Sequence, residues 1–138
     1  MDTGESRRMA LWYLQILRTG TILYNDMLPS LHRYLNAGSL TLADIGTTAT
    51  ELEHCRVEGC RLLALFWLQK LRNGSIMYPT YVSLLRQTLQ EGRLHAEVVG
   101  SSESEIESFL CVSAETFQKR AREPIHYSYS QQGVDNPR

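Results

Sequence analysis

The sequence predicts an all-α protein made by tandem duplication of a three-helix unit and packed as one helical bundle. Residues 9–57 align with residues 63–111 at a constant offset of 54, without a gap, and 16 of the 49 aligned positions are identical. Apolar residues recur at helical spacing in both segments, and glycines and helix-capping residues separate them. Because the register holds from the first predicted helix to the last, we interpret residues 6–57 and 60–111 as copies of one unit.

The first helix of each unit is expected over residues 6–18 and 60–72. Both segments are apolar nearly all round, which is typical of helices buried on more than one side. We therefore expect residues 9–17 and 62–71 to form the centre of the bundle. Gly20 and Gly74 follow directly and are interpreted as C-terminal caps, where the chain needs a residue that tolerates positive φ.

The second helix of each unit has one apolar stripe. The stripe residues lie at i, i+3 and i+7, and are Leu28, Leu31 and Leu35 in the first unit and Val82, Leu85 and Leu89 in the second. Pro79 suits a first helical position, whereas Pro29 lies later in the register, so the first-unit helix is expected to begin about a turn later with Asp26 as its N-cap. Gly38 and Gly92 are expected to end these helices.

The third helix begins with a capping box in each unit. Thr48 with Glu51, and Ser102 with Glu105, are spaced so that the hydroxyl accepts from the N3 amide while the Glu reaches back. The first-unit helix either runs on through residues 57–59 into the second unit or breaks at Gly59, and the sequence leaves both open.

The second-unit helix is expected to end near Arg122. The predicted organisation is one domain over residues 1–123 and a flexible C-terminal tail over residues 124–138, where the composition changes to Ser, Gln, Gly, Asn and Pro.

Composition favours an ordinary globular protein of the cytoplasm. The 138 residues include 14 Lys and Arg against 15 Asp and Glu, a net charge of −1, so overall charge attracts no particular partner. Three cysteines make an odd count that fits reduced thiols inside the cell. No leader pattern opens the chain, and its apolar runs are shorter than the roughly 20 residues that span a bilayer.

The sequence contains no recognisable pattern for catalysis, for a cofactor or for a metal. His54, Cys55 and Cys60 are zinc-ligand types, but their spacing matches no common zinc motif and the second unit has Ser108, Phe109 and Ala114 instead. The chain has no phosphate-binding glycine loop, no dinucleotide fingerprint and no nucleophile elbow. We therefore expect a non-enzymatic protein without cofactor or metal.

The leading functional hypothesis is a small adaptor or regulator, such as an inhibitor or anti-activator, that binds another protein or itself as a homodimer. Aromatic and arginine side chains at corresponding positions of both units are the candidate anchors, because these residue types dominate protein interfaces. These candidates are Trp12, Tyr13, Arg18 and Tyr24 in the first unit and Phe66, Trp67, Arg72 and Tyr78 in the second.

The alternative hypothesis is a helical subunit or transcriptional regulator that contacts DNA or RNA through basic residues. The candidates are Arg7, Arg8 and Arg61, and a basic cluster of Lys119, Arg120 and Arg122. Helix-end charges that complement the helix dipole explain the same residues without a ligand, and the near-neutral net charge favours that explanation.

Overall fold

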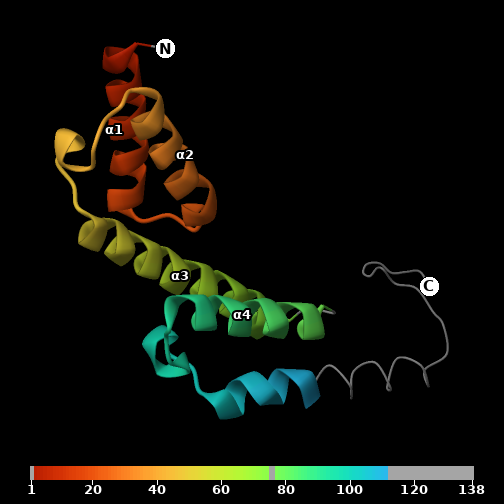
Figure 1. Cartoon of the computed structure of the whole chain (residues 1–138). Coiled ribbons are helices and arrows are strands. Elements are labelled where there is room, and N and C mark those ends of the chain that lie inside the picture. Colours follow the sequence, from red (N-terminus) through yellow and green to blue (C-terminus); the bar gives the residue numbers. More distant parts are fainter. Residues whose placement is uncertain (1, 75–76, 112–138) are drawn as a thin grey trace, which may run out of the picture.

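The computed structural model describes residues 2–74 and 77–111, and this part of the chain contains helices and loops but no strand (Figure 1). The elements are α1 (Thr3–Thr19), α2 (Tyr24–Ala37), the 3-10 turn η1 (Ala43–Ile45), α3 (Ala49–Arg72), α4 (Tyr78–Gly92), the 3-10 turn η2 (Ala96–Val99) and a helix over residues 103–111. The all-α prediction is confirmed. None of the helices in this part is both long and apolar enough to cross a membrane. The predicted end of the last helix near Arg122 and the predicted tail lie outside the described residues.

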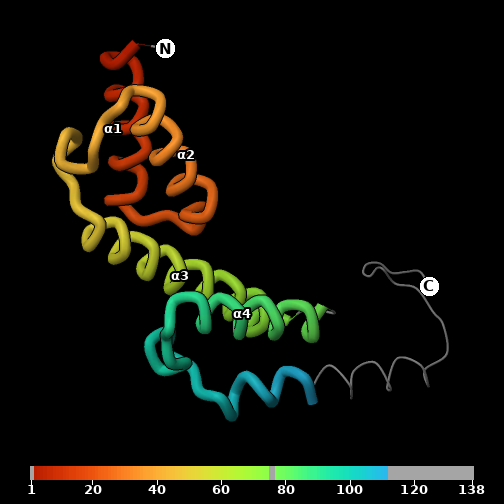
Figure 2. Tube along the Cα trace, in the orientation of Figure 1, coloured from red at the N-terminus to blue at the C-terminus, as the bar shows by residue number. Residues whose placement is uncertain are grey.

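The helices form two groups that share α3. α1 and α2 lie side by side at the N-terminal end of α3, whereas α4 and helix 103–111 lie along its C-terminal half (Figures 1 and 2). The buried apolar residues accordingly form two clusters instead of the single core expected around residues 9–17 and 62–71. α3 contributes Leu52 and Cys60 to the first cluster and Ala64, Leu68 and Leu71 to the second. The apolar residues of α1 therefore pack in one cluster, and those of the C-terminal half of α3 pack in the other.

α3 is one continuous helix of 24 residues that passes through Gly59. The structure therefore decides between the two possibilities left open by the sequence. A Cβ atom at Gly59 would lie 2.5 Å from Cδ1 of Tyr24 and 2.8 Å from the carbonyl oxygen of Thr21. Glycine is needed here because the connection from α1 to α2 crosses α3 in direct contact with the backbone of α3. Gly59 does not interrupt the helix.

Helix beginnings match the sequence prediction at two sites and differ at one. Thr48 and Ser102 each accept from an N3 amide, Glu51 and Glu105 respectively, at 3.1 Å. Asp26, in contrast, is not an N-cap: α2 begins at Tyr24, with Pro29 inside the helix. Proline is tolerated there because the N–H that it lacks would have donated to a carbonyl in the first turn of the helix. At most one hydrogen bond is therefore lost.

The second helix of each half ends in a Schellman motif whose left-handed residue is not glycine. Ser39 and Arg93 have φ angles of 55° and 53°, and the next amides, those of Leu40 and Leu94, donate to carbonyls five residues back at 2.8 Å. The neighbouring glycines serve a different purpose. A Cβ atom on Gly38 or Gly92 would lie 2.7 or 2.8 Å from the Cβ atom of Ser6 or Cys60 respectively, so these glycines allow close helix contact.

We expect Arg93→Gly to stabilise the protein by about 0.5–1 kcal/mol, because glycine adopts the left-handed conformation without the penalty of a Cβ atom, although its unfolded state is more flexible. Urea unfolding of the variant beside the wild type measures this change. Arg93→Ala is the matched control, since it removes the same side chain but keeps the Cβ atom. Equal stability of the two variants would contradict the assigned strain.

Contacts recur between the two halves at the same offset of 54 residues. The repeated hydrogen bonds include the amides of Gly20 and Gly74 to carbonyls three residues back, those of Gly46 and Gly100 likewise, and those of Thr47 and Ser101 to carbonyls five residues back. The loops between helices therefore have the same hydrogen-bonding pattern in both halves, which explains why their glycine and hydroxyl residues are shared.

Candidate interaction surface

Trp12 and Phe66 occupy corresponding positions on α1 and α3, and both are exposed. Their exposed fractions are 55% and 40%, although both are large apolar residues. Leu23 and Met77, a second corresponding pair just before α2 and α4, are 51% and 47% exposed. The structure thus presents large apolar side chains to solvent at the same two positions of each half. We call the pair Trp12 and Phe66 the apolar anchors.

Each apolar anchor lies against an aromatic neighbour that is partly buried. The rings of Trp12 and Tyr13 are 5.0 Å apart at 77°, and those of Phe66 and Trp67 are 5.0 Å apart at 69°. Tyr13 stacks in turn on Tyr34 at 5.7 Å. These edge-to-face contacts fix the exposed rings against the fold, and a rigid aromatic ring loses little conformational entropy when it binds a partner.

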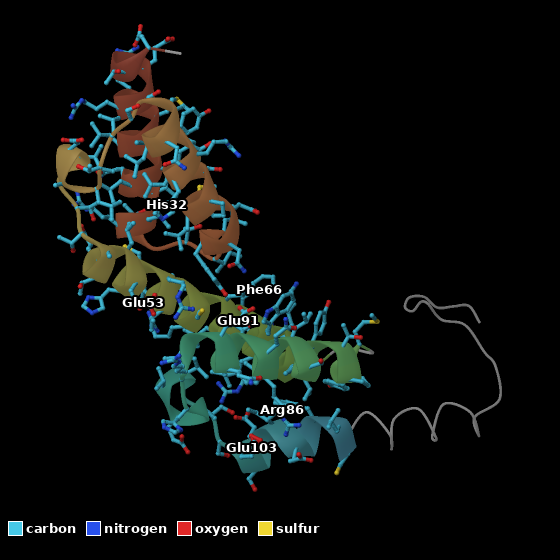
Figure 3. All side chains as sticks on the ribbon, in the orientation of Figure 1. His32, Glu53, Phe66, Arg86, Glu91 and Glu103 are labelled. Atoms are coloured by element: carbon cyan, nitrogen blue, oxygen red, sulfur yellow. The ribbon has the colours of Figure 1, made fainter. Side chains whose placement is uncertain are left out.

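Trp67 has the same kind of support, but from a residue at a different position. It stacks on Tyr81 at 5.5 Å, whereas the residue that corresponds to Tyr34 is the buried Thr88. The Nε1 atom of Trp67 is buried and has no hydrogen-bond partner among the described residues. Of the predicted anchors, Tyr13 and Trp67 thus act mainly as supports for the exposed rings beside them. Figure 3 shows Phe66 on α3.

Arg18 and Arg72, predicted partner anchors, are both exposed but make hydrogen bonds within the chain. Arg18 makes two hydrogen bonds to the carboxylate of Glu51, at 2.7 and 2.9 Å, and a third to the carbonyl of Gly46. Arg72 makes the same three bonds to Glu105 and Gly100. Each arginine thereby ties the end of the first helix of its half to the beginning of the third. This internal contact is sufficient to explain why the arginine recurs.

The two acidic partners differ from the predicted capping boxes. Instead of reaching back to the cap backbone, Glu51 and Glu105 accept from Arg18 and Arg72 and from the hydroxyls of the residues before the caps. The arginine hydrogen bonds lower the pKa of each carboxyl to about 2, from an ordinary value of 4.5, and the hydroxyls contribute in the same direction. We call each set of Arg, Glu and hydroxyl a clasp.

We expect the clasps to lose their contribution to stability as the pH falls from about 4.5 toward 2. A carboxyl whose pKa is lowered by folding stabilises the native state above its unfolded pKa, and this contribution disappears as the native carboxyl is protonated. Urea unfolding across this pH range measures the free energy of unfolding. As the pH falls, this free energy should decline more steeply for the wild type than for Arg18→Gln/Arg72→Gln. The other carboxylates are common to both proteins and affect both curves of free energy against pH equally. Parallel curves would therefore show that the clasps do not contribute to stability.

Tyr24 and Tyr78 correspond in sequence but not in environment. Tyr24 is 1% exposed, and its hydroxyl donates to Oε1 of Glu91 at 3.0 Å. Burial raises its pKa, with hydrogen bonds to Cys60 and Glu91 acting in the same direction. Tyr78 is only partly buried and stacks on Phe109 at 6.1 Å. The structure therefore places Tyr24 in the junction between the halves, where its role is in packing.

The basic residues predicted for nucleic-acid contact do not form a free set on the described part of the chain. Arg7 donates to the carbonyl of Asp44 at 2.6 Å, and Arg61 forms an ion pair with Glu58 at 2.7 Å. Arg8 is exposed. The remaining candidates, Lys119, Arg120 and Arg122, lie outside the described residues.

The cysteine and histidine group has a packing explanation. Cys60 is fully buried at the contact with Gly92, and burial raises the pKa of the partly buried Cys55. His54 is exposed. Within residues 2–74 and 77–111 no group of three or more His, Cys, Asp or Glu side chains is arranged to hold a metal ion.

Comparison with protein-family models, with curated proteins and with solved structures finds no match.

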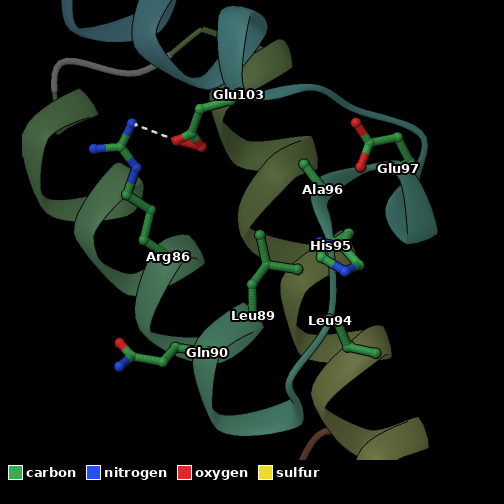
Figure 4. Close-up of a pocket in the computed structure, with 8 residues that line it drawn as sticks. All are labelled: Arg86, Leu89, Gln90, Leu94, His95, Ala96, Glu97 and Glu103. Atoms are coloured by element: carbon green, nitrogen blue, oxygen red, sulfur yellow. Dashed lines mark hydrogen bonds and ion pairs between the residues drawn. The ribbon is translucent and has the colours of Figure 1, made fainter.

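Sequence reasoning missed one feature of the surface. Arg86 on α4 forms ion pairs with Glu103 and Glu107 on helix 103–111, at 3.1 and 2.7 Å. The corresponding residues of the first half are His32, Ala49 and Glu53, so the alignment of the two halves contained the signal as a gain of one cation and one carboxylate. Figure 3 shows Arg86 and Glu103 facing each other, and both line a recess that Figure 4 shows in close-up.

Proposed function

We propose that this chain is a non-enzymatic binding protein, composed of two copies of one helical unit, that acts by contact with another protein. The observation that carries the proposal is the exposure of a large aromatic residue at the same position of both halves, Trp12 and Phe66. Neither ring is needed to fill its own core, since the buried clusters contain neither. Exposed aromatic side chains with fixed orientation are typical of binding hot spots.

The duplication is supported by the recurrence of the clasps, the Schellman motifs and the loop hydrogen bonds at one offset. The continuous α3 and the junction around Tyr24 hold the halves together, so a duplicated unit presents its binding residue twice at a fixed spacing. Such an arrangement suits an adaptor or regulator that covers a surface of its partner. The three unpaired cysteines favour an intracellular setting.

Site-specific photo-crosslinking tests this function. A photoreactive phenylalanine analogue at position 12 or 66 is compared with the same analogue at Gln15 or Gln69, which are exposed one turn away. In extract of cells that make the protein, we expect a discrete crosslinked product from positions 12 and 66 and much less from the control positions. Equal labelling from all four positions, or none, would argue against a binding role for the apolar anchors.

Self-association is tested in the same preparations. If the partner is a second copy of the chain, purified protein alone gives the crosslinked product, and sedimentation velocity shows a species of twice the monomer mass.

A further inference from the structure

Each half has an aromatic cluster with a cation over one of its rings. The clusters are Trp12, Tyr13 and Tyr34 in the first half and Phe66, Trp67 and Tyr81 in the second. The guanidinium carbon of Arg33 lies 5.7 Å from the ring centroid of Tyr34. Nζ of Lys70 lies 5.3 Å from the ring centroid of Phe66. Both distances are those of a cation–π contact, so each aromatic cluster has a positive charge beside it.

The two cations do not occupy corresponding positions. Arg33 aligns with Gln87, and Lys70 aligns with Ile16. The combination of an aromatic cluster and a cation therefore occurs in both halves although the cationic residues themselves are not shared. The clasps, in contrast, are internal contacts that recur residue by residue at the offset of 54. This difference favours a role for the two cations at the surface.

Neither cation is neutralised by a described carboxylate. Within residues 2–74 and 77–111, the Arg33 side chain donates only to Oγ of Ser30, at 3.3 Å, and Lys70 forms no ion pair. Other arginines in the same part of the chain pair with glutamates, namely Arg18, Arg56, Arg61, Arg72 and Arg86. Since Lys70 is exposed, its charge is accessible to a carboxylate of a partner.

The second aromatic cluster lies in a stretch of the sequence without acidic residues. Residues 59–90, which include the C-terminal half of α3 and most of α4, contain four cations and no aspartate or glutamate. Three of these cations are the arginines that pair with glutamates outside the stretch. Lys70 is the fourth. The exposed ring of Phe66 is therefore accompanied by one positive charge that the described chain does not balance.

On the basis of the binding function proposed above, we propose that the partner contacts Phe66 and Lys70 through an acidic segment, in which a large apolar side chain lies close to an aspartate or glutamate. The apolar side chain packs on the exposed ring, and the carboxylate accepts a hydrogen bond from Nζ of Lys70. Because the ring holds the ammonium group in place, less side-chain entropy is lost when this pair forms.

A single unbalanced cation favours a carboxylate over a nucleic acid or an anionic membrane. Nucleic acids and anionic lipid surfaces present many phosphates, and proteins bind them through several Lys and Arg side chains together. The other cations of residues 59–90 are already paired, and the net charge of −1 gives a polyanion little long-range attraction. The surface therefore fits a protein segment with one or two acidic side chains.

Selection from a library of random peptides displayed on phage tests the proposal. The full wild-type chain is the target, and the enriched peptides are synthesised and titrated against it by fluorescence anisotropy. We expect these peptides to contain Asp or Glu within a few residues of Leu, Phe or Trp, more often than the starting library does. Replacement of the acids in a peptide by Asn and Gln should weaken its binding.

Variants of the chain identify the cation. Lys70→Gln should weaken the binding of the acidic peptides by about fivefold, the upper end of what an exposed ion pair contributes. Lys70→Arg keeps the charge and should bind at least as tightly as Lys70→Gln and close to the wild type. The matched control is Arg93→Gln, which removes an exposed cation at the end of α4 that lies over no described ring, and it should bind like the wild type. High salt should reduce the difference between the wild type and Lys70→Gln.

Three results would overturn the acidic partner. They are the absence of enriched peptides, enriched peptides without an excess of acids, and equal affinity of the acidic peptides for the wild type and Lys70→Gln. Tighter binding of a single-stranded oligonucleotide, or of vesicles that contain phosphatidylserine, would assign the surface to phosphates if it depended on Lys70.

Failure of the proposed function gives a different result. Enriched peptides would then bind Phe66→Ser as tightly as the wild type, which would remove the apolar anchor from the binding surface. Peptides that lose affinity for Phe66→Ser but not for Lys70→Gln would support the binding function and overturn the acidic partner alone. Circular dichroism checks that each variant remains folded.

Discussion

Gly59→Ala is expected to destabilise the protein by about 1–3 kcal/mol, although alanine is the better helix former. A Cβ atom at this position would meet the ring of Tyr24 at 2.5 Å and the carbonyl oxygen of Thr21 at 2.8 Å. The second contact is with backbone, which cannot turn away as a side chain can, so the α1–α2 connection must shift from α3. Urea unfolding followed by circular dichroism measures the change in the free energy of unfolding.

Gly4→Ala is the control for this variant. Gly4 also lies in a helix, but its new Cβ atom would approach only side-chain atoms, Oδ1 of the N-cap Asp2 at 3.3 Å and Nη1 of Arg8 at 3.9 Å, and no backbone atom. We expect this variant to be stabilised by helix propensity, by about 0.5–1 kcal/mol. If Gly59→Ala were stabilised to the same extent, the close crossing of the α1–α2 connection over α3 would be wrong.

Gly38→Ala and Gly92→Ala are each expected to cost about 1–3 kcal/mol, for one shared reason. Their new Cβ atoms would lie 2.7 Å from Cβ of Ser6 and 2.8 Å from Cβ of Cys60, and Ser6 and Cys60 are fully buried. The two helices in contact must separate to admit the extra methyl group. Thermal or urea unfolding of the two variants measures the costs, and we expect similar values because the geometry is the same in both halves.

A double-mutant cycle isolates the contact. Ser6→Gly removes the Cβ atom that opposes residue 38, so Gly38→Ala should cost less in that background by about 1 kcal/mol or more. Additive effects of Ser6→Gly and Gly38→Ala would mean that the two residues are not in contact, and would remove the physical reason for glycine at the ends of these helices.

The sequence was sufficient for features that depend on local chemistry. Thr48 and Ser102 are predicted as helix caps because each hydroxyl residue stands just before a helix and three residues ahead of a glutamate, which is the capping-box pattern. Both accept a hydrogen bond from the N3 amide in the structure. The shared register also predicted which loops would resemble each other. These signals lie within a few residues of one another, so no knowledge of packing is needed to interpret them.

Features that depend on the approach of distant segments could not be predicted in this way. Gly59 was compatible with a break in α3 or with a close contact, and only the position of Tyr24 distinguishes the two. Arg18 and Arg72 have the composition of interface residues, yet their acidic partners lie 33 residues away along the chain. The division of the apolar residues into two clusters likewise follows from the direction of α3, which the sequence pattern does not specify.

The candidate surface was partly predictable. Trp12 and Phe66 were among the residues proposed from the sequence, and the structure leaves both exposed. Tyr24 was proposed on the same grounds but is buried, because aromatic composition alone does not distinguish a core residue from a surface residue. The ion pairs of Arg86 were missed because Arg86 and Glu103 have no counterpart in the first half, whereas the prediction concentrated on what the halves share.

The most direct test of the central claim is competition for the crosslinked product formed at position 66. Unlabelled wild-type protein should suppress the product, as should Gln15→Ser/Gln69→Ser, because neither glutamine is an anchor. Trp12→Ser/Phe66→Ser should remain folded, since both rings are largely outside the core, and should fail to compete at the same concentration. Competition by this double variant as effective as that of the wild type would contradict the claim that the chain binds its partner through the apolar anchors.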